Sequence, residues 1–153
     1  MKENQNLFDT NLWSGGEYDN SLNNISSMED NQKIMISNQW QSNGETSFLI
    51  KRGGGTGYNW TRFRYKTTNA KLKLTIKFKI YSPNAEADIW LYDMYNGNEG
   101  THNGVHIYPS NKIQDITISF NGSLSNVTEY GLRINLLNDS TWLFIDDISL
   151  TSN

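Results

Sequence analysis

Apolar and polar residues alternate along much of this chain, which is the pattern of strands that bury one face. The clearest example is KLKLTIKFKIY, where alternate positions are apolar and the intervening ones are lysine or threonine. Its apolar side consists of Leu72, Leu74, Ile76, Phe78 and Ile80. Shorter alternation occurs in TSFLIK, TRFRY, DIWLYDMY, DITISF, YGLRINL and WLFIDDISL. The pattern predicts about eight to ten short strands.

The segments between these strands are rich in residues that form turns. They read SNGE, SPNAE, NGNEGTHNG, FNGS and LNDS. No segment keeps the i, i+3, i+4, i+7 apolar spacing of a helix, and the capping box at Ser26 and Glu29 is followed by the polar run EDNQK. We therefore expect at most one helical turn there, within an all-β antiparallel sandwich or barrel.

Composition restricts the number of domains and the classes of partner. At 153 residues the chain is expected to form one domain, residues 1–153, and its 36% apolar content implies a thin core under a broad polar surface. The net charge of −3 provides no general positive field, so nucleic acid is not expected as a partner. No apolar run is long enough for membrane insertion, and the absence of cysteine excludes disulfides and thiolate chemistry.

The stretch KRGGGTGYNWTRFRYK, residues 51–66, combines glycines with positive charges and aromatic rings. A phosphate-binding P-loop needs Lys-Ser/Thr after its glycines, but Gly57 is followed by Tyr-Asn. A dinucleotide turn needs a further glycine where Trp60 stands, and both motifs need a helix to begin there. We interpret the glycines as a connection that crosses to the opposite sheet, and residues 60–66 as the strand that follows it.

Patterns for metal binding and catalysis are weak. His102 and His106 lie in THNGVH, where an Asn-Gly turn is expected between them, so they do not match the helical histidine pair of a zinc site. The carboxylates show no pairing of the glycosidase kind, and no G-x-S-x-G motif occurs. Because nothing assembles a nucleophile, a base and an oxyanion site, we predict that the chain is not an enzyme.

The two ends of the chain carry a family resemblance. The C-terminal WLFIDDISLT, residues 142–151, resembles the closing strand of jelly-roll carbohydrate-binding modules of the galactose-binding-like kind, and NLFDTNLWS, residues 6–14, resembles their opening strand. The order of the segments GETSFLI, KLKLTIKFKI, IWLYD and ITISF is also similar. The resemblance spans nearly the whole chain and implies an all-β antiparallel jelly-roll β-sandwich. It also implies a non-catalytic module that binds a polysaccharide or cell-surface glycan within a larger extracellular protein.

The resemblance further implies a structural Ca²⁺ held by an opening glutamate and by the closing Asp-Asp pair. Asp146 and Asp147 match the pair, but residues 13–14 read Trp-Ser where the family has Phe-Glu, so one carboxylate is missing. Asp9 or Glu17 could replace it, since calcium takes about six to eight oxygen ligands. The alternative is that the pair forms a bulge or lies solvated at the rim of the sandwich.

The resemblance also divides the strands between two sheets. One sheet is expected to contain residues 71–80, 115–120 and 142–150, and the other residues 60–66, 88–95, 104–108 and 130–137. In the first sheet, Lys71, Lys73, Lys77 and Lys79 would face Asp115, Thr117 and Ser119 as a solvated surface. In the second sheet, Ile89, Leu91, Phe63 and Tyr65 are expected to turn inward, which turns their neighbours outward. The alternative is that Trp90 and Tyr92 point into the core while Ile89 and Leu91 point out, or that both faces of the sheet are covered.

The outward residues of the second sheet form the predicted saccharide site. Flat rings pack against the C–H faces of pyranoses, and guanidinium and amide groups form directional hydrogen bonds with hydroxyls. We predict a stacking platform of Trp90 and Tyr92, hydrogen bonds from Arg133, Asn135, Arg62 and Arg64, and a groove edged by Trp60, His106 and Tyr108. The competing hypothesis is a structural or adhesive β-sandwich module, as in a surface adhesin or a phage tail fibre, with the same strands.

Overall fold

The computed structural model describes residues 13–15, 32–44, 46–54, 60–71 and 73–152. Within them the chain forms strands only: β1 (Trp13–Gly15), β2 (Gln32–Ser37), β3 (Ser47–Arg52), β4 (Trp60–Lys66), β5 (Lys73–Tyr81), β6 (Ala87–Tyr95), β7 (Asn98–Ile107), β8 (Gln114–Asn121), β9 (Glu129–Leu136) and β10 (Thr141–Ser152). No helix in the described part is long and apolar enough to cross a membrane. The capping box at Ser26 and Glu29 lies outside the described residues.

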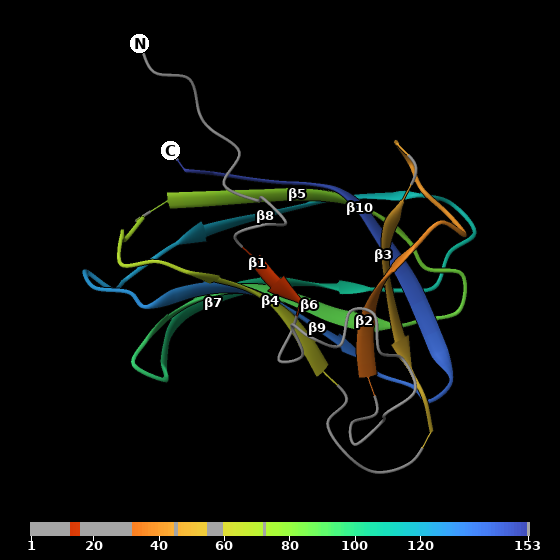
Figure 1. Ribbon diagram of the computed structural model, residues 1–153, viewed down its shortest axis with the longest axis horizontal. Helices are drawn as coiled ribbons and strands as arrows, with labels where there is room; N and C mark the ends of the chain where they lie inside the picture. Colours follow the sequence, from red (N-terminus) through yellow and green to blue (C-terminus); the bar gives the residue numbers. More distant parts are fainter. Residues whose placement is uncertain (1–12, 16–31, 45, 55–59, 72, 153) are drawn as a thin grey trace.

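The strands form two antiparallel sheets that pack face to face (Figure 1). Sheet A has the order β1-β4-β9-β6-β7, and sheet B has the order β2-β3-β10-β5-β8. The predicted division of the strands is therefore confirmed, as is the all-β sandwich. Of the predicted opening strand, only β1 is described, and it pairs with β4 through Trp13 and Tyr65.

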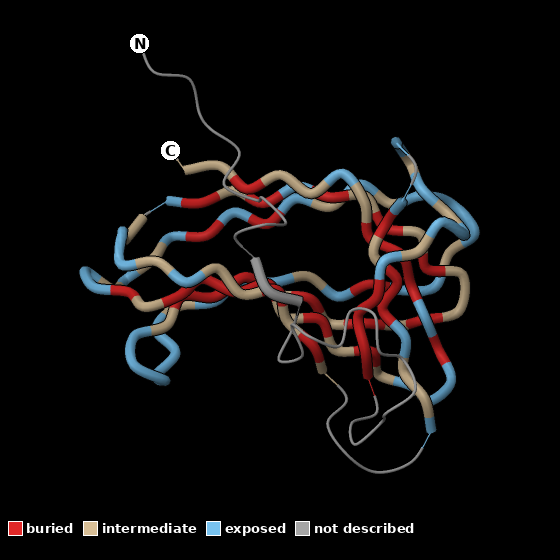
Figure 2. Tube along the Cα trace, viewed as in Figure 1, coloured by how far each residue is buried: buried red, intermediate tan, exposed pale blue. Residues whose placement is uncertain are grey.

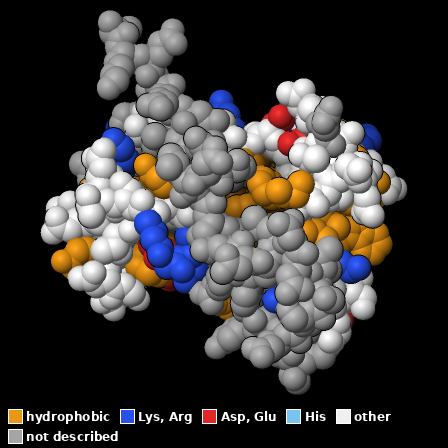
Figure 3. Space-filling view, in the orientation of Figure 1, with side chains coloured by type: hydrophobic (Ala, Val, Ile, Leu, Met, Phe, Trp, Pro, Cys, Tyr) orange, Lys and Arg blue, Asp and Glu red, His pale blue; other side chains and the backbone are white. Residues whose placement is uncertain are grey.

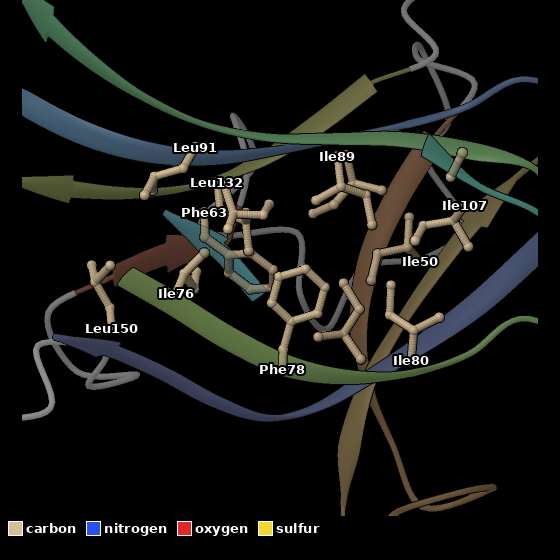
Figure 4. Packing of buried hydrophobic residues seen from close by; sticks show 14 of the residues in the cluster. Ile50, Phe63, Ile76, Phe78, Ile80, Ile89, Leu91, Ile107, Leu132 and Leu150 are labelled. Atoms are coloured by element: carbon tan, nitrogen blue, oxygen red, sulfur yellow. The ribbon is translucent and has the colours of Figure 1, made fainter. Parts of the chain in front are cut away.

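The hydrophobic core lies between the two sheets because each strand turns alternate residues inward. In β5 the burial pattern alternates along the strand, with Leu74, Ile76, Phe78 and Ile80 buried and the lysines outside. Figure 4 shows Phe78 and Ile76 pointing toward Ile89, Leu132 and Phe63 from the opposite sheet. The red segments in Figure 2 follow the same alternation along both layers.

The structure confirms two predictions about individual segments and adds one strand that was not predicted. The crossing after residue 51 is confirmed, because β3 lies in sheet B and β4 in sheet A; residues 55–59 lie outside the described part. The lysine face is confirmed by the ion pair between Lys79 Nζ and Asp115 Oδ1, 2.8 Å apart. Strand β2 was not predicted, because its polar start hides the alternation: Gln32 is buried and donates to Thr61 Oγ1 and to the Ile134 carbonyl.

The turn predicted between His102 and His106 is wrong. Residues 98–107 form one continuous strand, β7, and the reversal of the chain lies earlier, at Asn96 and Gly97, which adopt φ angles of 47° and 82°. That pair suits a tight hairpin turn because both residues tolerate the left-handed region. The two histidines share a strand face about 13 Å apart, which still separates them too far for a shared metal ion.

Candidate functional site

Register brings residues from four strands of sheet A into rows across its outer face. One row joins Trp60, Asn135, Asp88 and His106. The next joins Arg62, Arg133, Trp90 and Gly104, and the third joins Arg64, Gly131, Tyr92 and His102. We call these three rows the outer face of sheet A. They contain eight of the nine predicted saccharide-binding residues, drawn from positions as far apart in sequence as Trp60 and Asn135.

A guanidinium lies between two indole rings at the centre of this face. The Cζ atom of Arg133 is 4.3 Å from the ring centroid of Trp60 and 4.8 Å from that of Trp90. The Cζ atom of Arg62 lies 5.4 Å from the Trp60 centroid. Each contact lies within the range of cation–π attraction, so the arginines hold the two rings at fixed positions. Trp90 remains partly exposed, while Ile89 and Leu91 on either side are buried as predicted.

Strand β7, at the edge of sheet A, leaves one side of Trp90 uncovered. The residue of β7 that pairs with Trp90 is Gly104, which has no side chain to cover the ring. A Cβ atom on Gly104 would lie 2.6 Å from Trp90 Cβ and 2.5 Å from the Ile89 carbonyl oxygen, so no larger residue fits without movement. Beside this pair is a hollow of about 360 Å³, lined by Asp88, Ile89, Trp90, His102, Gly104, Val105 and His106. A ring edge and several polar groups therefore meet in one open concavity.

His106 is held in place by two carboxylates. Its Nδ1 lies 2.6 Å from Asp88 Oδ1 and its Nε2 lies 2.6 Å from Glu86 Oε1. The hydrogen bonds to Asp88 and then Glu86 raise the pKa of His106, because both stabilise the imidazolium. Tyr108, expected in the same strand, follows the end of β7, is exposed, and packs its ring edgewise on His106 with centroids 4.7 Å apart. It contacts His106, which lines the hollow, but does not line the hollow itself.

The prediction that Tyr92 forms an exposed stacking platform is wrong. Tyr92 lies on the predicted side of the sheet, but it has no accessible surface. Its ring lies over Gly131 on β9, where the absence of a side chain leaves room for the phenol. Its hydroxyl lies 3.1 Å from Arg62 Nη1 and 3.2 Å from Glu129 Oε2. The ring is therefore covered by its neighbours and cannot stack on a ligand.

Glu129, which the sequence reasoning missed, connects these groups. Arg64 donates to it from Nε over 3.1 Å and from Nη2 over 2.8 Å, so the predicted ligand contact from Arg64 is largely committed to this pair. Burial alone raises the pKa of Glu129, but the hydrogen bond and charge of Arg64, with those of Arg62 and Tyr92, bring it below its usual value. Burial raises the pKa of Tyr92. Within this network the Glu129 carboxyl group is therefore ionised and the Tyr92 hydroxyl is neutral.

The structure thus keeps most of the predicted site together while changing the roles of its members. Trp60, Trp90, Arg62, Arg133 and Asn135 lie on one face, partly exposed. Asp88, Gly104 and Glu129 were not predicted, since only their register partners reveal them and register is not visible in the local pattern.

The Asp-Asp pair forms a bulge, as the structural alternative predicted. Pairing of β10 with β5 shifts between Asp146 and Ser149, and Asp147 has a positive φ of 54°. Asp146 Oδ2 accepts hydrogen bonds from the backbone N–H groups of Ser42 and Asn43, at 2.9 and 3.0 Å, and from the Ser42 hydroxyl at 3.1 Å. This carboxylate anchors the turn that follows β2.

Calcium at this bulge stays a prediction. Within the described residues no group of three or more histidine, aspartate or glutamate side chains is arranged to hold a metal ion. The two carboxylates therefore fit only part of a calcium shell of about six to eight oxygens. Further ligands would have to come from the opening segment, where Asp9 and Glu17 lie outside the described residues.

Comparisons with known proteins relate this geometry to a fold. No protein-family model matches the chain, and no curated protein sequence matches it. The structure is similar to a family 11 carbohydrate-binding module from Clostridium thermocellum in complex with a β-1,3-1,4-mixed-linked tetrasaccharide, with 15% identity, a TM-score of 0.60 and coverage of 100% of this chain and 98% of that chain. It is also similar to TmCBM61 in complex with β-1,4-galactotriose, with 14% identity, a TM-score of 0.55 and coverage of 97% and 99%.

A third similar structure belongs to a different kind of protein. It is the enzymatically active domain of tailspike protein 4 from bacteriophage CBA120, with 10% identity and a TM-score of 0.66. The match covers 95% of this chain but spans only 20% of the tailspike chain. Taken with the carbohydrate-binding modules, which match over nearly their whole length, the comparison shows that this chain has the jelly-roll fold of such modules.

Proposed function

We propose that this chain is a non-catalytic carbohydrate-binding module and that the outer face of sheet A binds an oligo- or polysaccharide. The observation that carries the proposal is the pairing of Trp90 with Gly104 beside an open hollow. An indole that remains partly exposed on a sheet face gives up some of the free energy of burial, roughly 25 cal/mol for each Å² of apolar surface. A ligand that stacks on the ring recovers it.

The groups around Trp90 suit a sugar. The C–H face of a pyranose packs on the flat ring, and Gly104 leaves the neighbouring position open for the next sugar unit. Arg133 lies in the same row as Trp90, and Asn135 and Asp88 lie in the adjacent row, with donors and acceptors for vicinal hydroxyls. His106 and Glu86 fix the Asp88 carboxylate, so this acceptor is preorganised before the ligand arrives.

The same groups support binding without catalysis. The carboxylates nearest the face are engaged, Glu129 by Arg64 and both Glu86 and Asp88 by His106, so none is placed as a paired acid and nucleophile. A weak binding module acts through tethering, since it raises the effective concentration of its covalent neighbours at a polymer. We place it accordingly in a larger extracellular protein. The saccharides held by the two similar modules, a β-1,3-1,4-mixed-linked tetrasaccharide and β-1,4-galactotriose, are the first probes to use.

The test is calorimetric titration of the chain with these two oligosaccharides, together with native affinity gels containing the parent polymers. Trp90→Ala is expected to weaken binding by about tenfold or more, through loss of the stacking surface. Tyr95→Ala is the matched control, because Tyr95 is an exposed aromatic residue on the same strand outside the three rows. Undiminished binding by Trp90→Ala, or no retention of the parent chain by any glycan on an array, contradicts the proposal. In the second case a structural or adhesive role remains, and release of reducing sugar would instead indicate a hydrolase.

A further inference from the structure

Trp142 is an exposed indole on the side of the sandwich opposite to Trp90. It lies on β10 in sheet B, where Leu143 and Ile145 point into the core and Trp142 therefore points outward. Its cross-strand partner on β3 is Lys51. The ring keeps 37% of its surface exposed.

An apolar cluster covers part of this face of sheet B but does not include Trp142. Phe144, the next outward residue of β10, packs with Met35 and Leu49 beneath Trp40, and the Trp40 and Phe144 centroids are 5.9 Å apart. Trp40 also stacks on Tyr81. Apolar side chains reach the surface over β10 in Figure 3. The described cluster does not include Trp142, so this indole lies beside a built apolar layer without belonging to it.

Next to Trp142 is a hollow with rigid walls. Its volume is about 330 Å³, and it is lined by Gln39, Leu49, Lys51, Arg52, Gly53, Ser140 and Trp142. Arg52 is fixed at one wall, donating to the Leu136 carbonyl over 2.5 Å and pairing with Asp139 Oδ1 over 3.0 Å. The Ser140 N–H donates to the Gly53 carbonyl at 3.3 Å, which ties the two loops that form the floor. The shape is therefore present before any ligand binds.

The polar groups of this hollow favour oxygen acceptors. Lys51 and Gln39 are exposed at its rim and supply an ammonium and an amide. The Arg52 Nε–H is buried and has no hydrogen-bond acceptor within the described residues, while the charge of Arg52 is paired with Asp139, so Lys51 supplies the cation that faces the hollow. An indole platform bordered by these donors matches a sugar ring with an apolar face and an oxygen-rich edge.

We propose that this hollow is a second saccharide-binding site, centred on Trp142, for a pyranose whose hydroxyl or carboxylate oxygens accept hydrogen bonds from Lys51 and Gln39. It goes beyond the proposed function, because it lies on the other sheet and uses none of the residues of the outer face of sheet A. Two sites on opposite sheets let one module contact two polysaccharide chains. Such bivalent contact strengthens attachment to a network even where each site is weak.

The test separates the two sites by mutation. Parent chain, Trp90→Ala, Trp142→Ala and the double variant are titrated with β-1,4-galactotriose, trigalacturonic acid and the mixed-linked tetrasaccharide. The parent is expected to bind two equivalents, each single variant one, and the double variant none. The parent is also expected to precipitate the corresponding soluble polymer, and either single substitution abolishes precipitation. Ile113→Ala, which truncates another exposed apolar side chain, is the control and is expected to behave as the parent.

A second variant keeps the outcome clear if Trp142→Ala unfolds. Lys51→Glu changes an exposed rim residue and leaves the indole packing intact, and it is expected to weaken the Trp142 site about tenfold or more. A stronger loss for trigalacturonic acid identifies a carboxylate as the acceptor, and an equal loss for all probes identifies hydroxyls.

The two proposals fail in different ways. One equivalent bound by the parent and abolished by Trp90→Ala, with Trp142→Ala and Lys51→Glu unchanged, overturns the second site and leaves the proposed function standing. If the parent binds one equivalent that Trp142→Ala abolishes and Trp90→Ala leaves unaffected, the proposed function of the outer face of sheet A is overturned and the Trp142 site stands. No binding of any of the three probes by the parent, in titration or precipitation, overturns both for these sugar classes.

Discussion

The ring of Tyr92 on β6 lies over Gly131 on β9, in the space that a side chain at position 131 would fill. This contact buries the phenol and places its hydroxyl against Glu129 and Arg62. It makes Trp90 the more exposed of the two aromatic residues that β6 turns outward, so the open part of the face shifts toward β7 and Gly104.

Replacing Gly131 tests this contact. Gly131→Ala is expected to lower the free energy of unfolding by roughly 1–3 kcal/mol, because the new Cβ overlaps the Tyr92 ring and the well-packed sheet must shift. Urea denaturation measures the change. Gly54→Ala is the control, since a Cβ there meets nothing within 4 Å and its φ is not positive. In Tyr92→Ala chains the same Gly131→Ala substitution is expected to cost less, and an equal cost in both backgrounds contradicts the proposed overlap.

The ion pairs of His106 predict a pH dependence of stability. Its folded-state pKa is raised above the ordinary value of 6.5, so the protonated ring stabilises the fold fully below about pH 6.5 and the contribution is lost as pH rises through the folded pKa. Thermal melts of the parent and His106→Gln are therefore expected to differ most near pH 6 and to converge at higher pH.

His102→Gln provides the control for that series. His102 is exposed on the same strand, and its substitution is expected to leave the pH profile of the parent unchanged. A melting difference between parent and His106→Gln that does not vary from pH 6 to pH 9 would show that the two carboxylates do not hold a charged ring.

The bulge in β10 predicts an order of stability for substitutions at Asp147. Asp147→Gly and Asp147→Ala both remove the 2.8 Å hydrogen bond between the carboxylate and the Ser42 hydroxyl. Only alanine places a Cβ in the left-handed backbone at φ 54°. The glycine variant is expected to be the more stable by roughly 1 kcal/mol, as measured by urea denaturation. An alanine variant equal to or more stable than the glycine variant contradicts this backbone assignment.

Calcium is tested by chelation. If Asp146 and Asp147 hold the ion together with the opening segment, EDTA lowers the melting temperature of the parent, and added Ca²⁺ restores it, because a ligand that binds only the native state stabilises it. Asp146→Asn is then expected to melt at the same temperature with and without EDTA. A parent chain insensitive to EDTA, with Asp146→Asn still destabilised, shows that Asp146 only anchors Ser42 and Asn43.

The division of strands between the sheets was predictable because the family resemblance implied it, and apolar alternation then indicated which side chains of each strand face the core. Strand β2 was missed because local alternation cannot show why a polar residue is buried. The buried Gln32 side chain donates to Thr61 Oγ1 and the Ile134 carbonyl and accepts from the Leu136 N–H, and none of these partners is near it in sequence. The misplaced turn in β7 has a similar cause, since Asn-Gly occurs in a strand when the neighbouring Trp90 needs a small residue opposite it.

By itself the sequence determined which side chains of each strand face the core, because a period of two is a property of the extended backbone and needs no partner. Together with the division of strands that the resemblance implies, this predicted that Trp90, Arg62 and Arg133 share one face, which the register bears out. Only the tertiary structure decided which of these residues meet, because register joins positions far apart in the chain. Register placed Tyr92 against Gly131 and buried it, and it placed Trp90 against Gly104 and left it open.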